Sequence, residues 1–302
     1  MLAPVALFVY KRAGHMHRVL DGLRRNPQAV ITDLFVYSDA PRNQAAEEGV
    51  QQVREELKDI RGFRSVTVVA RDHNLGIASS ITQGVDELTQ RFGCVIVLED
   101  DLLPSSHFLA YMNEALSRYE HDTRVVSIHA YCYPIPAILP QTFFLRGADC
   151  WGWATWRRGW EVFESNGEKL LAEIKRQRLE SAFDFNDSYP YTLMLEDAVA
   201  GRNDSWAVRW YASAFLRGLL TLYPGSSQVQ NIGADGSGQH VGATDIFFHR
   251  EWGQPVSVEN IPIEESLVAR PAFIQFLRST RPSLIRRAWH RLQRIGVPVW
   301  LG

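Results

Sequence analysis

The 302-residue sequence is poor in cysteine, has no long apolar run and carries no excess of positive charge. Its three cysteines are odd in number and lack Cys-x-x-Cys spacing, so neither a disulfide framework nor a zinc site is indicated, and a reducing, cytoplasmic compartment is favoured. No apolar run reaches the roughly 18 residues that a membrane-spanning helix needs. The short apolar opening, residues 2–10, has no basic segment before it and is not typical of a signal peptide.

The charge balance also excludes a class of partner. The formal net charge is −2 and the isoelectric point lies near 6.5, so the sequence lacks the basic footprint expected of a nucleic-acid-binding protein. The first predicted strand, residues 4–10, is followed by neither a Walker loop nor a Gly-x-Gly-x-x-Gly turn. Any bound phosphate must therefore be neutralised by a metal ion and by Arg12 rather than by a glycine-rich loop.

The central feature of the sequence is an apolar run, residues 94–98, that ends on the carboxylates Glu99, Asp100 and Asp101. A run of this length is typical of a strand covered on both faces in a parallel sheet. In open α/β sheets ligands bind beyond the carboxyl ends of the strands, so these acids stand where a site is expected. Adjacent carboxylates repel one another unless a cation or a hydroxyl-rich ligand takes up their charge. A solvated acidic turn is the structural alternative.

Strand-like and helix-like segments alternate through the first 130 residues. Strand patterns occur at 4–10, 34–37, 65–70, 94–98 and 125–128, and helical patterns at 15–25, 44–58, 77–92 and 106–119. Because parallel strands need a crossover helix between them, this order predicts an α/β fold with a mostly parallel, Rossmann-like sheet flanked by helices. The hydrophobic content of 46% is enough to bury a full core.

The composition changes after residue 130. Residues 131–160 are rich in aromatic side chains, and four tryptophans stand between 151 and 160. Aromatic rings beside guanidinium groups suit sugar rings and phosphate, although any one of these aromatics can equally belong to the core. Helical patterns follow at 169–181, 190–200 and 206–219, then a strand at 221–224 and a glycine-rich loop at 231–240.

The strand-end acids, with an isolated Asp39 at the end of the neighbouring strand, suit a nucleotide-sugar site in which Mn²⁺ or Mg²⁺ bridges a diphosphate. In this pattern the sequence resembles the GT-A glycosyltransferases, within them the branch of N-acetylglucosaminyltransferase I, over residues 4–245. The stretch 151–156 is similar to one in bacterial sugar transferases. The resemblance implies a GT-A fold with an acceptor-side subdomain.

The resemblance assigns roles to the residues at the strand ends. It implies that Asp101 holds the metal and that Glu99 and Asp100 line the donor. It places Arg12 near the donor phosphate or sugar, and Asp39 against the uracil ring.

Two further donor contacts are implied in the second half. A Gly-x-Gly-Trp turn beside donor and acceptor corresponds to Trp151, Gly152 and Trp153. A late loop that reaches the diphosphate corresponds to the segment around His240.

The resemblance places the catalytic base at Asp204, where the family has an aspartate ahead of an acid and a tryptophan. Here Ser205 replaces that acid, which weakens the match. Asp204 could instead serve only as the N-cap of the following helix. Four other acids of the acceptor half are rival bases: Asp184, Asp187, Glu196 and Asp197.

The end of the chain has a different character. Residues 283–295 form a basic amphipathic helical pattern, which predicts either a helix docked on the catalytic domain or contact with an anionic membrane surface. We expect a glycosyltransferase domain at 1–252, with a nucleotide-sugar-binding half at 1–103 and an acceptor half at 104–252, and a C-terminal extension at 253–302.

Together with the strand-end acids, the resemblance implies a bacterial, metal-dependent, inverting glycosyltransferase of polysaccharide biosynthesis. By the resemblance, the donor is a UDP sugar carrying N-acetylglucosamine or a similar sugar. The expected acceptor is a glycan or a lipid-linked saccharide at the inner face of the cell membrane. Two alternatives remain at this stage. One is a nucleotidyltransferase, which would normally carry a glycine-rich basic loop after its first strand. The other is a carbohydrate-binding module that keeps the fold without turnover.

Overall fold

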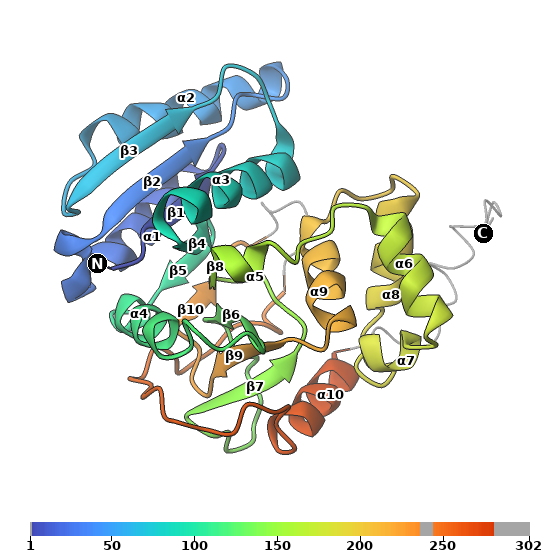
Figure 1. Cartoon of the computed structure of the whole chain (residues 1–302). Coiled ribbons are helices and arrows are strands. Elements are labelled where there is room, and N and C mark those ends of the chain that lie inside the picture. The colour runs from blue at the N-terminus through green and yellow to red at the C-terminus, as the bar shows by residue number, and fades with distance from the viewer. Residues whose placement is uncertain (1, 236–243, 281–302) are drawn as a thin grey trace, which may run out of the picture.

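The computed structural model describes residues 2–235 and 244–280. Its centre is a mixed eight-stranded sheet with the strand order β3-β2-β1-β4-β8-β6-β9-β7 (Figure 1). A second sheet pairs β5 (Leu102–Pro104) with β10 (Val229–Asn231) in antiparallel fashion. The α/β class and the flanking helices agree with the sequence prediction.

The first half of the chain builds the parallel side of the sheet. The strands β1 to β4 pair in parallel around β1, as the alternating pattern predicted. The elements are β1 (Val5–Val9), α1 (Ala13–Arg24), η1 (Pro27–Ile31), β2 (Asp33–Ser38), η2 (Gln44–Ala46), α2 (Glu47–Glu56), η3 (Leu57–Asp59), β3 (Ser65–Ala70), α3 (Gly76–Phe92) and β4 (Cys94–Glu99).

The second half completes the same sheet and adds a helical group beside it. In Figure 1, α6, α8 and α9 lie together on the side away from β3. The elements are α4 (Phe108–Arg118), β6 (Val125–His129), β7 (Thr142–Arg146), β8 (Trp153–Trp156), α5 (Arg157–Trp160), α6 (Gly167–Arg176), α7 (Glu180–Phe183), α8 (Tyr191–Val199), α9 (Trp206–Leu216), β9 (Leu220–Pro224) and α10 (Ala269–Ser279).

Strand β8 is the main departure from the sequence prediction. It lies between β4 and β6 and is antiparallel to both, so a segment expected to form a sugar-binding surface is a central strand. Because successive side chains of a strand point to opposite faces of the sheet, Trp153 packs into the core on one face and Trp156 into the core on the other face. Trp153 is 1% exposed and packs against Trp206 and Trp210 of α9.

The two faces of the sheet are covered by different helices. Side chains of α1, α2 and α4 pack with Val5, Leu7 and Val9 on one face. Side chains of α3, α5 and α9 pack with Ala6 and Phe8 on the other. Strands β1 and β4 are covered on both faces, and their sequences are therefore apolar almost throughout. The packing on both faces also fixes the positions of their carboxyl ends.

The sheet continues across the expected boundary at residue 103, since β4 pairs with both β1 and β8. An isolated bridge between Phe144 and Glu265 ties the segment before α10 to β7. The basic pattern at 283–295 lies outside the described residues. Within the described ranges, no helix combines the length and apolar character that a bilayer crossing would require.

Candidate active site

A cavity of about 470 Å³ opens at the carboxyl ends of β1, β2 and β4. It brings together Arg12, Asp39 and the three acids 99–101 from the first half of the chain with Trp151 and Asp204 from the second. Its volume falls in the range of roughly 300–1,000 Å³ that is usual for ligand sites. The structure thus gathers in one place most of the side chains that the sequence singled out.

Arg12 clamps two of the strand-end acids. Its Nη2 donates to Asp100 and, over 2.8 Å, to Oδ2 of Asp101. Burial alone would lower the pKa of Arg12, but the two carboxylates raise it more, and the guanidinium remains charged. Its Nη1 is buried and has no partner among the described residues, which leaves N–H donors for an anionic ligand.

The first two acids of the triplet, Glu99 and Asp100, are both buried, and burial raises the pKa of each. Burial raises the pKa of Glu99 to about 8, and the carboxylates of Asp101 and Asp100 add to the rise. Burial also raises the pKa of Asp100, although its ion pair with Arg12 opposes the shift. The raised pKa favours the protonated form of Glu99, which can donate a hydrogen bond to a ligand hydroxyl.

Asp101 has the features of a metal ligand. Its carboxylate is half-buried, lines the cavity and offers hard oxygen atoms of the kind that Mn²⁺ and Mg²⁺ prefer. Gly233 lies so close that a Cβ added there would come within 2.3 Å of Oδ2 of Asp101. In the described part of the chain, no group of three or more His, Cys, Asp or Glu side chains could hold a metal ion. A cation bound by one or two carboxylates plus substrate phosphates is a usual arrangement for Mg²⁺.

Asp39 is at the cavity, but its carboxylate is already fully engaged. Oδ1 accepts hydrogen bonds from the backbone N–H groups of Ala40 and Leu75, both over 2.9 Å. Oδ2 accepts from Gly76 N–H over 2.9 Å and from the Asn74 amide over 3.0 Å. Helix α3 has no side-chain cap of its own, so Asp39 supplies acceptors for its first N–H groups from a neighbouring strand. The sequence could not show this second role.

Replacing Asp39 by alanine should therefore lower the stability of the fold. Three backbone N–H groups would lose their acceptor in a site where Asp39 is 7% exposed, and each buried orphan costs about 1–3 kcal/mol. We expect the free energy of unfolding to fall by on the order of 3 kcal/mol in denaturant titrations.

A control for Asp39 is Arg42→Ala, which changes another lining residue without removing the cap of α3. That variant should keep its unfolding midpoint. If Asp39→Ala melts like the wild type, the capping role is wrong.

The turn before β8 depends on glycine and on a buried histidine. Gly152 has a φ of +69°, and a Cβ there would meet Val229 Cγ1 at 3.0 Å. The N–H of Trp151 donates to Nε2 of His129 over 3.1 Å, and burial lowers the pKa of this histidine. Trp151 thereby reaches the cavity wall, whereas Trp153 does not line it.

Asp204 lines the cavity, and the structure removes its competing role as a helix cap. The N-cap of α9 is Ser205, whose hydroxyl accepts from Val208 N–H. The Asp204 carboxylate accepts no hydrogen bond from the described residues, and Arg209 donates to its carbonyl oxygen over 3.4 Å. An unengaged carboxylate in the cavity is free to bind or deprotonate a ligand.

None of the four rival acids lines this cavity. Asp184 accepts from the N–H and hydroxyl of Thr192, and Asp187 accepts from Ser181. The other two form ion pairs outside it: Glu196 with Lys175 and Asp197 with Arg202. The predicted donor residue His240 lies outside the described residues.

One cavity residue, Asp149, was not singled out by the sequence. Its Oδ1 accepts from Cys150 N–H over 2.8 Å, and Oδ2 accepts from the Tyr223 hydroxyl over 3.4 Å. Tyr189 and Tyr191 line the same wall, and burial, followed by the charge of Asp149, raises the pKa of both phenols. The acid adjoining the predicted Trp-Gly-Trp turn was the only signal in the sequence.

Comparison with known proteins identifies the family. Residues 9–176, more than half of the chain, match the family described as Glycosyl transferase family 2. The chain belongs to this family. The matched range runs from β1 to the end of α6 and includes Arg12, Asp39 and the carboxylate triplet. Glycosyl transfer, rather than nucleotidyl transfer, is therefore its chemistry, and its sheet has the GT-A arrangement that the sequence predicted. The comparison with curated proteins gave no match.

The solved structures that match this chain have low sequence identity and low TM-scores. A mannosyltransferase of Pyrobaculum calidifontis in complex with GDP-Man and Mn²⁺ has 15% identity over 72% of this chain and 70% of its own, with a TM-score of 0.35. TarS of S. aureus has 12% identity over 74% of this chain and 36% of its own, with a TM-score of 0.37. A UDP-glucose pyrophosphorylase with bound UDP-glucose has 8% identity over 77% and 94%, with a TM-score of 0.38.

Proposed function

We propose that this family 2 glycosyltransferase is a metal-dependent, inverting enzyme that moves a sugar from a UDP-sugar donor to an acceptor hydroxyl. The observation that supports this most is the meeting of three groups in one cavity: the Arg12 clamp, the carboxylate of Asp101 and the unengaged carboxylate of Asp204. An inverting transfer needs a site for a diphosphate and a base for the acceptor.

The residues of the first half hold the donor. Asp101 would hold Mn²⁺ or Mg²⁺, which when bound neutralises the charge that develops on the departing diphosphate. The buried guanidinium of Arg12 keeps N–H donors for phosphate oxygens. Glu99 and Asp100 lie beside it and would line the donor sugar. Asp39 and Asn74 stand at the end of the cavity that we assign to uracil.

The residues of the second half act on the acceptor. Asp204 takes the proton from the acceptor hydroxyl while that oxygen attacks the anomeric carbon, and the bond to the diphosphate breaks on the opposite side. Direct displacement of this kind inverts the anomeric configuration. Trp151 offers an indole ring for the sugar, and Asp149 with its tyrosines offers acceptors and donors for sugar hydroxyls. His240 is proposed to reach the diphosphate.

The sugar transferred is proposed to be N-acetylglucosamine or a related hexose, and the acceptor a glycan or lipid-linked saccharide of bacterial polysaccharide biosynthesis. The enzyme would then work in the cytoplasm, at the inner face of the membrane. The basic segment 283–295 would supply the membrane contact.

Donor hydrolysis tests the proposal without knowledge of the acceptor. The purified chain with Mn²⁺ should release UDP slowly from UDP-N-acetylglucosamine or UDP-glucose, and a chelator should stop the release. GDP and ADP sugars should be hydrolysed more slowly. Tight binding of UDP with no release from any sugar donor would favour the alternative of a binding module without turnover.

A further inference from the structure

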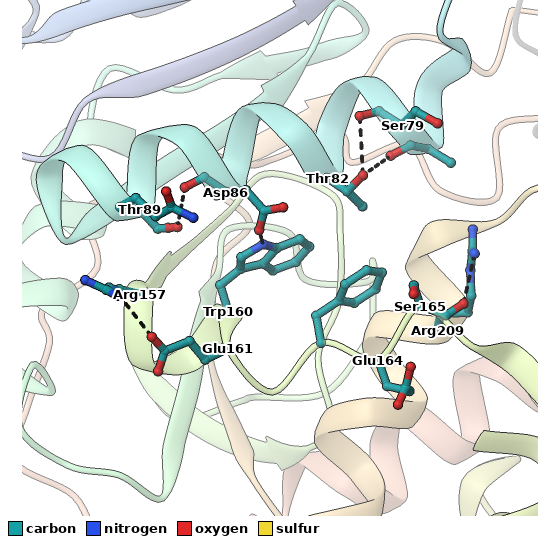
Figure 2. A pocket seen from close by; sticks show the side chains of 13 residues that line it. Ser79, Thr82, Asp86, Thr89, Arg157, Trp160, Glu161, Glu164, Ser165 and Arg209 are labelled. Atoms are coloured by element: carbon teal, nitrogen blue, oxygen red, sulfur yellow. Dashed lines mark hydrogen bonds and ion pairs between the residues drawn. The ribbon is translucent and has the colours of Figure 1, made fainter. Parts of the chain in front are cut away.

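A second hollow lies beside the active-site cavity and is separate from it. This groove, of about 530 Å³, runs between α3 and the segment from α5 to residue 165, with Arg209 of α9 at one end (Figure 2). In Figure 2, Thr89 and Asp86 lie toward the Arg157 end and Thr82 and Ser79 toward the Arg209 end. The volume is ample for a ligand.

The floor of the groove is the half-buried ring of Phe163, which is held in place by the buried ring of Trp160 beneath it. Trp160 and Phe163 stack with ring centroids 4.7 Å apart and an interplanar angle of 6°. The indole Nε1–H of Trp160 donates to Oδ1 of Asp86 over 2.5 Å, which fixes the ring against α3. A rigid aromatic surface can bind an apolar ring face without a large loss of side-chain entropy.

The walls of the groove carry both hydrogen-bond donors and acceptors. Carboxylates come from Asp86, Glu161 and Glu164, guanidinium groups from Arg157 and Arg209, and hydroxyl or amide groups from Ser79, Thr82, Ser165 and Gln90. Three acids against two bases give no net attraction for an anion such as phosphate. An uncharged ligand rich in hydroxyls, with apolar ring faces, uses both the mixed walls and the aromatic floor.

The groove adjoins the segment that carries Asp204. Arg209, at its end, donates to the carbonyl oxygens of Ser165 over 3.2 Å and of Ser205 over 3.2 Å. Helix α3 borders both hollows, since Ile77 faces the active-site cavity while Ser79 faces the groove. A saccharide chain whose end lies at Asp204 can therefore continue past Arg209 along α3.

We propose that this groove binds the saccharide chain of the acceptor, several sugar units away from the reacting hydroxyl. The proposal rests on the proposed function for its place in catalysis, but saccharide binding in the groove can be measured alone. The probes are two neutral hexasaccharides, maltohexaose and chitohexaose. The signal is the Trp160 indole N–H in ¹H–¹⁵N spectra, assigned with Trp160→Phe.

We expect at least one hexasaccharide to shift the Trp160 signal below 10 mM in the wild-type chain. Ser79→Trp, which fills the exposed side of the groove, should weaken this binding at least tenfold. Phe163→Leu, which keeps apolar packing but removes the ring, should weaken it as well. Gln51→Trp places the same side chain at an exposed position of α2, on the other face of the sheet, and should bind like the wild type.

Release of UDP into water should stay within about twofold of wild type in Ser79→Trp, because no donor residue changes. If the wild-type chain releases no UDP from any sugar donor, the proposed function is rejected, but saccharide binding in the groove can still be measured. The groove proposal is overturned if neither hexasaccharide shifts the Trp160 signal at 10 mM, if Ser79→Trp binds as the wild type does, or if inorganic phosphate causes the same shift.

Discussion

Replacing Asp204 by asparagine is expected to lower sugar transfer by roughly 10²–10⁴-fold, the usual effect of removing a general base. The amide has nearly the size and shape of the carboxylate but cannot accept the acceptor proton. Binding of UDP with Mn²⁺, measured by calorimetry, should stay near its wild-type value. Because Ser205, rather than Asp204, caps α9, the melting temperature should also be unchanged.

Two controls separate the base from the cap and from its rivals. Ser205→Ala removes the cap and should lower the free energy of unfolding by about 1 kcal/mol while leaving the carboxylate in place. Asp187→Asn changes an exposed acid outside the cavity and should transfer sugar as the wild type does. Near-wild-type transfer by Asp204→Asn would move the base elsewhere, with Asp149 the next candidate in the cavity.

Replacing Asp101 by asparagine is expected to abolish the metal dependence of donor binding. The substitution removes the charge that holds the cation but keeps an oxygen that can accept from Arg12, so the clamp is not lost with it. Electrophilic stabilisation by a metal ion is worth several kcal/mol, and each 1.36 kcal/mol is a factor of ten in rate, so turnover should fall on the order of 10³-fold.

Calorimetry of UDP with and without Mn²⁺ measures the Asp101 effect directly. In the wild type, a chelator should weaken UDP binding strongly, and in the variant it should change little. Glu114→Gln, on α4 and remote from the cavity lining, should behave as the wild type. A variant that keeps the full response to Mn²⁺ would exclude Asp101 as the ligand.

The sequence alone determined the parallel half of the sheet and the position of the acids. The apolar run of β4 is local information, because a strand buried on both faces must be apolar throughout. The rule that sites lie beyond strand ends then placed Glu99, Asp100 and Asp101 at the edge where the cavity is found. Asp39 followed from the same rule on β2, whereas Arg12 was predicted from the lack of a glycine-rich loop after β1 and from the family resemblance.

Only the tertiary structure decided which side chains of the second half lie in the core and which line the cavity. Strand β8 enters the sheet between β4 and β6, and this non-local pairing, rather than any local pattern, makes Trp153 a core residue and leaves Trp151 at the cavity. The sequence also could not show that the carboxylate of Asp204 is unengaged. Asp and Ser cap helices about equally well, so either Asp204 or Ser205 could have been the N-cap of α9.

The remaining differences arise from contacts between segments far apart in the chain. Asp39 caps α3 across a gap of about 36 residues, and Asp149 meets Tyr223 across 74. Sequence spacing fixes which side chains share one strand face or one helix face, but hydrogen bonds between separate elements depend on how those elements pack. The sequence therefore determined which groups are available, and packing decided which carboxylates are engaged within the protein and which face the cavity.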